Sequence, residues 1–181
     1  MKHCLVLGGL LLLFSGSLFA GTCLPGTLQD YILLGSSGCD VSGVQFQDFY
    51  LASGQSFATP IDPAEIQVTP GGSVNSPTLL LTLNRTANAG DLLESIFHYS
   101  AAFPTLLSAE IALGASEVTQ DGAVTGVLDV CAGGLFLAGI PAGCSGLPDT
   151  AIAFATASDS QLSSRISFPA TSLAMVFISS G

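Results

Sequence analysis

The sequence predicts an all-β fold: a β-sandwich or jelly roll in a single domain, with one short helix near its N-terminus. Roughly nine or ten short apolar segments are separated by turn residues at intervals of about 10–15 residues, as in sandwich folds. The 181-residue chain contains 21 Gly and 9 Pro, which supply those turns. No segment repeats at a fixed period, so a solenoid or propeller is not predicted.

The charge of the chain excludes nucleic acid as an expected partner. The sequence has 3 Lys+Arg against 13 Asp+Glu, a formal net charge of -10. A nucleic-acid binder needs clustered cations to displace counterions from phosphates. At 49% hydrophobic residues, the chain is also too apolar for an acidic disordered segment. The composition therefore indicates a folded domain with a sparsely charged surface.

The first 20 residues are predicted to be a signal peptide. Lys2 and His3 precede an apolar run over residues 5–14, and small residues lead up to Ala20, after which we expect cleavage. The stretch is shorter than the about 20 residues that span a membrane comfortably. An uncleaved anchor is the alternative. Cleavage leaves residues 21–181 as the secreted β-sandwich domain, and we expect no stable membrane span in it.

The four cysteines that remain after cleavage are predicted to form two disulfides. The chain has 5 Cys, and Cys4 leaves with the signal peptide. An even number of cysteines in an exported domain indicates disulfides. Three pairings are open, and the local one is favoured because it closes two short, glycine-containing loops: Cys23 with Cys39, and Cys131 with Cys144. Zinc is not expected, because no two of these cysteines have the spacing of zinc ligands.

A short helix is predicted at the start of the mature domain. Thr27 followed three residues later by Asp30 resembles a capping box. Gly35 is expected to end the helix. Three apolar side chains within it fall on one face: Leu28, Tyr31 and Ile32.

The segments that follow are predicted as strands from their periodicity and flanking turns. Residues 41–51 alternate between apolar and polar, with one slip before Phe49. Residues 65–69 alternate strictly, and Pro70-Gly71-Gly72 is expected to end that strand. The leucine run in residues 78–83 predicts a strand that is buried on both faces.

A hairpin is the strongest local prediction in the second half of the chain. Asp121-Gly122 stands between two arms, residues 106–120 and 123–131, and this dipeptide favours the turn of a two-residue β-hairpin. Residues 92–102 fit either helical or strand periodicity, and their aromatic and β-branched second half favours a strand. Three further strands are predicted: residues 151–156, 162–168 and 172–178.

The sequence offers no set of catalytic residues, and no cofactor is expected. His98 is the only histidine of the mature domain, and we expect it on the solvent-facing side of a strand. No Gly-x-Ser-x-Gly motif occurs. A glycoside hydrolase needs two carboxylates across one sugar ring, whereas the acids here are scattered singly, for example Asp48, Glu65 and Asp129. Arg85 and Arg165 are each expected to pair with a carboxylate.

Two binding chemistries remain open at this point. The chain has no Trp, so a carbohydrate-binding surface would use tyrosine rings, and the candidates are Tyr31, Tyr50 and Tyr99. An acidic exported β protein can also bind calcium, but the EF-hand pattern is absent. An irregular calcium site would draw on loop aspartates, and solvation of a charged surface is the alternative. The candidate aspartates are Asp40, Asp62 and Asp121.

The start of the mature domain resembles a family of exported bacterial proteins. It reads Cys-Leu-Pro-Gly-Thr-Leu-Gln-Asp-Tyr-Ile over residues 23–32, then Gly38-Cys39 before a Val-Gln-Phe-Gln-Asp-Phe strand, and later Ile-Gln-Val-Thr-Pro over residues 66–70. These residues are similar to those of the extracellular domains of PEP-CTERM proteins, which exosortases sort. The resemblance implies an all-β bacterial surface or matrix protein without catalytic residues. The Pro-Glu-Pro sorting motif is absent before Gly181, so we expect either a fragment or a released protein.

The function expected from the sequence follows from these observations. We expect a secreted, non-enzymatic structural or interaction protein of the bacterial cell surface or extracellular matrix. Its expected partner is an extracellular polysaccharide or another matrix component. A carbohydrate-binding module is the first alternative, and a secreted glycoside hydrolase is the second.

Overall fold

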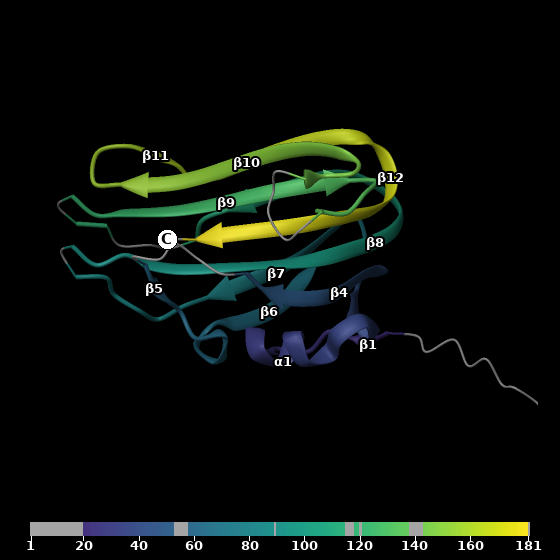
Figure 1. The fold of residues 1–181 in the computed structure, drawn as a ribbon, viewed down its shortest axis with the longest axis horizontal. Coiled ribbons are helices and arrows are strands. Elements are labelled where there is room, and N and C mark those ends of the chain that lie inside the picture. The colour runs from purple at the N-terminus through teal and green to yellow at the C-terminus, as the bar shows by residue number, and fades with distance from the viewer. Residues whose placement is uncertain are drawn as a thin grey trace, which may run out of the picture.

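The computed structural model describes residues 20–52, 58–88, 90–114, 118–119, 121–137 and 143–180. The predicted signal peptide, apart from Ala20, lies outside the described residues. The described chain consists of strands, one short α-helix and two single turns of 3₁₀-helix (Figure 1). The all-β fold with a short N-terminal helix is therefore confirmed.

The largest element is one long, mostly antiparallel sheet. Its central strands follow one another in the order β3 (Cys39–Val41), β4 (Val44–Leu51), β8 (Leu93–Ala112), β12 (Ser163–Ser180), β9 (Ala123–Ala132) and β10 (Leu147–Thr156). Three two-residue strands extend it: β1 (Gly21–Thr22) on β3, β11 (Ser160–Gln161) on β10, and β5 (Thr59–Pro60) beside the start of β8. The strand that comes last in the described chain thus lies in the middle of the sheet.

The two longest strands, β8 and β12, belong to both layers of a sandwich. They pair with each other from Ser163 opposite Ala112 to Ser180 opposite Ser95, but the register shifts on both sides of Thr171. Bulges of this kind bend and twist a strand pair. Pro104 of β8 lies in the same region, where an uninterrupted ladder would need its missing N–H. Figure 1 shows both strands curving round at one end of the molecule.

Beyond this bend, the β8–β12 ribbon covers the inner face of strands β9 and β10. Ile166 of the ribbon packs in one buried cluster with Leu128 and Val130 of β9 and with Ala151 of β10. The burial of these aliphatic side chains between two strand layers is what defines a β-sandwich. The predicted sandwich is therefore formed in part by a strand pair that folds back on its own sheet.

A small second sheet and the helix cover the rest of the inner face. The sheet consists of β2 (Gly26–Thr27), β6 (Gln67–Ser73) and β7 (Ser76–Thr82). The helix α1 (Leu28–Leu34) lies beside it (Figure 1), flanked by the 3₁₀ turns η1 (Gly35–Ser37) and η2 (Pro63–Glu65). Leu28 and Val68 are almost fully buried in the resulting cluster. Tyr99 and Ile178 pack against both inner clusters and join them into one core.

The capping box that begins α1 is confirmed. The Asp30 backbone N–H donates to Thr27 Oγ1 at 3.1 Å, and the Thr27 N–H donates to Asp30 Oδ2 at 2.7 Å. These bonds satisfy donors that a helix start leaves unpaired. The backbone hydrogen bond from Thr27, aided by the Thr27 hydroxyl, lowers the pKa of Asp30. Gly35 follows at φ 56°, a conformation that glycine adopts without strain, and the helix ends there.

The slip predicted in residues 41–51 is a β-bulge. The register between β4 and β8 shifts between Gln47 and Tyr50, and Asp48 has φ 56°. The extra residue restores the inward direction of the next apolar side chain. Val44, Phe46 and Phe49 are consequently all buried, as the sequence predicted.

Two predictions about the β6–β7 region are wrong. Pro70-Gly71-Gly72 does not end a strand, because β6 continues to Ser73, which pairs with Ser76 across a two-residue turn. Residues 78–83 are not buried on both faces either: Leu80 is 57% exposed. A run of leucines alone cannot distinguish a central strand from an edge strand. β7 lies at the edge of the small sheet, and only one of its faces packs against the core.

The prediction of a hairpin at Asp121-Gly122 is also wrong for the described part of the chain. The Gly122 N–H donates to the Thr119 carbonyl oxygen at 3.1 Å, so a local turn exists. However, β8 and β9 do not pair with each other, and both pair with β12. Instead, the end of β8 lies in the folded-back ribbon and faces β9 from the other layer. The two strands are packed closely there: a Cβ added to Gly126 of β9 would lie 2.8 Å from Ile111 Cδ1 of β8. The connection therefore crosses from one layer to the other.

Candidate functional site

Both disulfides have the local pairing that the sequence favours. Cys23 is joined to Cys39 with a Cα–Cα distance of 4.8 Å, and Cys131 to Cys144 with 5.5 Å. The first disulfide fixes the start of the domain to β3. The second lies on the outer face of the large sheet, the face that turns away from the sandwich core.

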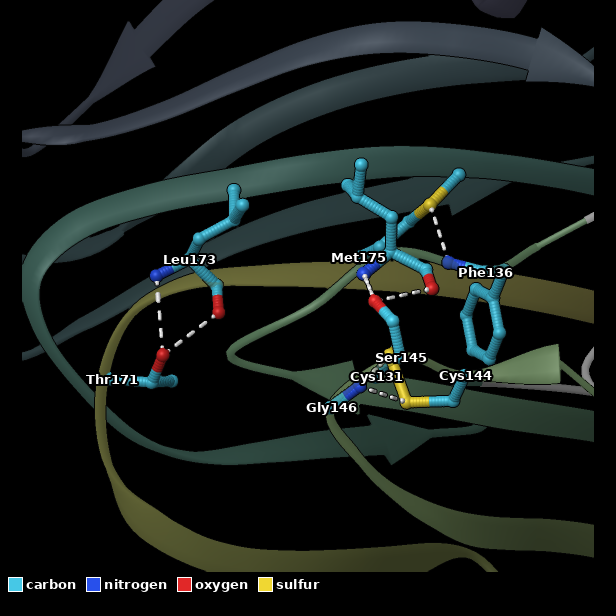
Figure 2. The surroundings of a disulfide bond; sticks show 9 residues. Cys131, Phe136, Cys144, Ser145, Gly146, Thr171, Leu173 and Met175 are labelled. Carbon is cyan, nitrogen blue, oxygen red and sulfur yellow. Dashed lines mark hydrogen bonds between the residues drawn. A yellow bond between two sulfur atoms is a disulfide. The ribbon is translucent and has the colours of Figure 1, made fainter.

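The segment around Cys144 covers one part of this outer face (Figure 2). The Phe136 N–H donates to Met175 Sδ at 3.3 Å, and the Phe136 ring lies edge-on to Phe177 at a centroid distance of 6.3 Å. The Gly146 N–H points at the Cys131 sulfur at 3.4 Å. A Cβ on Gly146 would collide with the Ala132 carbonyl oxygen, so the segment needs glycine to approach β9 this closely.

Five residues form a row across five strands, and the middle one, Phe177, packs against Phe136 in this covered part. Directly opposite partners in the ladders are Tyr50 with His98, His98 with Phe177, Phe177 with Asp129, and Asp129 with Thr150. Directly opposite residues point to the same face of a sheet, and neighbouring strands lie about 4.8 Å apart. The five residues, from here on the cross-strand row, therefore extend over roughly 19 Å on the outer face.

The two ends of the cross-strand row are open to solvent. Tyr50 is 62% exposed, and its ring lies 5.1 Å from the His98 ring, centroid to centroid. At the other end, the Thr150 hydroxyl donates to Asp129 Oδ1 at 2.6 Å. The row thus offers an aromatic ring at one end and a hydrogen-bonding carboxylate and hydroxyl at the other, with Phe177 buried between them.

His98 is not the freely solvated residue that the sequence predicted. It is half-buried, and its Nδ1 atom is buried without a hydrogen-bond partner in the described part of the chain. Removal from water disfavours the charged imidazolium, so the pKa of His98 is lowered, and the Asp48 carboxylate opposes this effect only in part. His98 is therefore a neutral ring at pH 7.

The lowered pKa of His98 predicts a pH-dependent stability. The unfolded chain takes up this proton at a higher pH than the native state, so the native state loses stability as the pH falls from about 7 to about 5. His98→Gln, which cannot titrate, is expected to show a smaller loss over the same interval. Urea unfolding of both proteins at both pH values checks this, and equal losses would contradict it. Asp30, also with a lowered pKa, contributes only below about pH 4.

Two of the three tyrosines proposed as sugar platforms do not reach the surface. Tyr31 is 2% exposed, and its hydroxyl donates to the Leu24 carbonyl oxygen at 2.9 Å. Tyr99 stacks on Phe49 at 5.3 Å between the layers, and its burial raises the pKa of its hydroxyl. Only Tyr50 keeps an open ring face, which the strand period alone did not reveal.

An open groove lies at a different place, between the β3–β4 turn and the bend of β8. It has a volume of about 550 Å³ and is lined by residues that include Asp40, Gln45, Phe103 and Ser172. Asp40 is the one carboxylate among its described lining residues, and its Oδ1 accepts the Gly43 N–H at 2.9 Å. Hydrolysis of a glycosidic bond uses two carboxylates, so this groove lacks one of them.

The remaining charged candidates have structural partners. Arg85 pairs with Glu65 at 2.7 Å, as predicted, whereas Arg165 donates to Ser108 Oγ at 2.7 Å and has no described carboxylate within salt-bridge distance. Asp62 accepts the Ala64 N–H and caps η2. Within the described ranges, no three His, Cys, Asp or Glu side chains are grouped so that they could hold a metal ion.

The fold and site define a class: an all-β protein with two disulfides and an open outer sheet face. Comparison with protein-family models, with curated protein sequences and with solved structures gave no match. Among the described residues, no helix combines the length and the apolar character that crossing a membrane requires.

Proposed function

We propose that this chain is a secreted, non-enzymatic structural or interaction protein of the bacterial cell surface or extracellular matrix. The signal-peptide pattern of residues 1–20 and the two disulfides support export to an oxidising compartment. The resemblance of residues 23–70 to PEP-CTERM proteins supports a bacterial surface or matrix location. The single carboxylate in the groove supports a role without catalysis.

The observation that carries the proposal is the cross-strand row. An enzyme site or a small-molecule site is concave and encloses its ligand, whereas this row runs along a sheet face, with solvent-exposed residues at its two ends and the buried Phe177 at its centre. Tyr50 supplies an aromatic face, and Asp129 and Thr150 supply hydrogen-bonding oxygens three and four strand spacings away. Only an extended ligand, such as a polymer, can contact both exposed ends of the row.

Polysaccharide is the second, more specific candidate, because of the exposed ring of Tyr50. The apolar face of a sugar ring packs on an aromatic face, and its hydroxyl groups require the polar partners that Asp129 and Thr150 provide. This candidate corresponds to a carbohydrate-binding module built on tyrosine instead of tryptophan.

The test uses the protein exported from a bacterial host and probed on an array of bacterial and plant polysaccharides. If the row binds sugar, Tyr50→Ala should weaken binding at least about tenfold, since exposed aromatic anchors dominate such surfaces. Tyr50→Phe should keep most of the binding because it keeps the ring.

Leu33→Ala is the control, because Leu33 is also an exposed apolar side chain, at 75% against 62% for Tyr50, but lies on α1. Binding that is lost equally in Leu33→Ala and Tyr50→Ala would remove the row from the proposal. Turnover of any glycan on the array would contradict the non-enzymatic role directly.

A further inference from the structure

The outer edge of β7 is an open strand edge. Its inner edge pairs with β6, and no other described strand pairs with it. An unpaired edge presents a row of N–H and C=O groups on which another strand can add. Natural edges are protected by charged residues or by proline. Residues 76–83 contain no charged residue, and their one proline, Pro77, precedes the Thr78–Thr82 stretch.

The prolines of the hairpin identify the backbone groups that face outward. Pro70 lies opposite Leu79, and Pro77 lies opposite Gly72. A proline lacks the N–H that a hydrogen-bonded ladder pair needs, so both are non-hydrogen-bonded pairs. The backbone groups of Leu79 therefore point away from β6, and by the two-residue period those of Leu81 do so as well.

The sequence of β7 reads the same in both directions around Leu80. Thr78, Leu79, Leu80, Leu81 and Thr82 form a Thr-Leu-Leu-Leu-Thr palindrome. Any strand can pair antiparallel with its own copy about a twofold axis. With the axis at Leu80, the palindrome places leucine opposite leucine and threonine opposite threonine at these five positions.

We propose that β7 pairs antiparallel with β7 of a second copy of this chain, with the twofold axis at Leu80. Leu79 of each copy then lies opposite Leu81 of the other copy. The backbone N–H and C=O groups of these residues, which point away from β6, form the hydrogen bonds between the two copies. The two Leu80 side chains, each 57% exposed in one copy, cover each other on the open face. On the opposite face of β7, Leu79 and Leu81 are half-buried against the core. In the dimer, these side chains from the two copies lie side by side and connect the two hydrophobic cores.

The net charge of the chain predicts a salt effect on this pairing. Two chains that each carry a net charge of -10 repel each other, and a strand without charges is where they can approach with least repulsion. Added salt screens this repulsion. Self-association is therefore expected to strengthen as the salt concentration rises, the opposite of an interface held by ion pairs.

The inference names one partner for the interaction protein proposed above and rests on that proposal, but its test is separate. Leu80→Cys places two thiols directly opposite each other at the twofold axis, within the Cα separation of a disulfide. Under mild oxidation it should form a covalent dimer at least about tenfold faster than Val74→Cys, because pairing raises the local thiol concentration. Val74 is 63% exposed in the turn of the same hairpin and is the matched control.

The register is tested by a mixture of two variants. Thr78→Cys and Thr82→Cys should cross-link with each other and only slowly each with itself, since Thr78 faces Thr82 across the axis. Sedimentation of the unmodified chain should show a concentration-dependent dimer that Leu80→Lys abolishes and Val74→Lys preserves.

Equal cross-linking of Leu80→Cys and Val74→Cys, or a monomer at every protein and salt concentration, would overturn the self-pairing. Loss of polysaccharide binding by Leu80→Lys in a chain that stays monomeric would assign the edge to another partner and also overturn it. A dimer that binds nothing on the glycan array would leave this inference standing and contradict the polysaccharide candidate alone.

Discussion

Phe49→Ala is expected to lower the free energy of unfolding by about 3–5 kcal/mol, as for other buried phenylalanines replaced by alanine. The Phe49 ring is 4% exposed and lies 5.2 Å from the Tyr31 ring and 5.3 Å from the Tyr99 ring. Its removal leaves a cavity between α1 and the large sheet, and the helix and two β-layers cannot collapse fully into it. Urea unfolding followed by near-UV circular dichroism measures the loss.

Tyr50→Ala is the matched control for this variant. Tyr50 is the next residue along β4 and also has a six-membered aromatic ring, but it points to the outer face. Its replacement should cost less than about 1 kcal/mol, because little surface is buried there. A similar loss in both variants would mean that Phe49 is not part of a packed aromatic cluster.

Removal of the Cys131–Cys144 disulfide by a double substitution to alanine is expected to cost about 3 kcal/mol. The reason is the freedom that a short loop regains in the unfolded chain when it is no longer closed. Cys131 is fully buried, so the substitution also leaves space beneath Phe136 and Phe177. The denaturation midpoint under non-reducing conditions should fall accordingly.

The position of the effect distinguishes this disulfide from the first one. Amide hydrogen exchange should rise at Leu135 and Phe136, whose N–H groups are held by Ser145 and Met175, and remain unchanged in α1. The double substitution of Cys23 and Cys39 should give the reverse pattern. Exchange that rises evenly through the whole domain in both variants would contradict a local role for the two disulfides.

Local features of the fold could be predicted from the sequence because their causes are local. The capping box needs only Thr27 and Asp30, and the bulge at Asp48 is visible as a slip before Phe49. The disulfide pairing also follows from loop length. Each of these depends on residues that are close together in the chain.

The wrong predictions concern which layer a strand joins. Asp121-Gly122 favours a hairpin wherever the two flanking segments can pair with each other. Here the segment before it pairs with β12 in the folded-back ribbon instead. The leucine run of β7 reads as a buried strand, but the strand lies at an edge. No residue pattern within either segment contains this information. For the segment before Asp121 it depends on partners 50 or more residues away, as between Ser108 and Ser167.

The candidate site could not be predicted for the same reason. The cross-strand row brings together Tyr50, His98 and Asp129 from three distant segments, and only the register of the sheet aligns them. One signal was available: an exposed tyrosine directly after the buried Phe49 had to point the other way. The sequence did identify Tyr50 as a candidate, but without the register it could not separate Tyr50 from Tyr31 and Tyr99.

The central place of β12 has a consequence for how the chain folds. The last described strand lies between β8 and β9, so neither half of the large sheet is complete until residues 163–180 have been synthesised. Contacts that are this distant in sequence form slowly. The sandwich therefore closes only once β12 is available to pair with both β8 and β9.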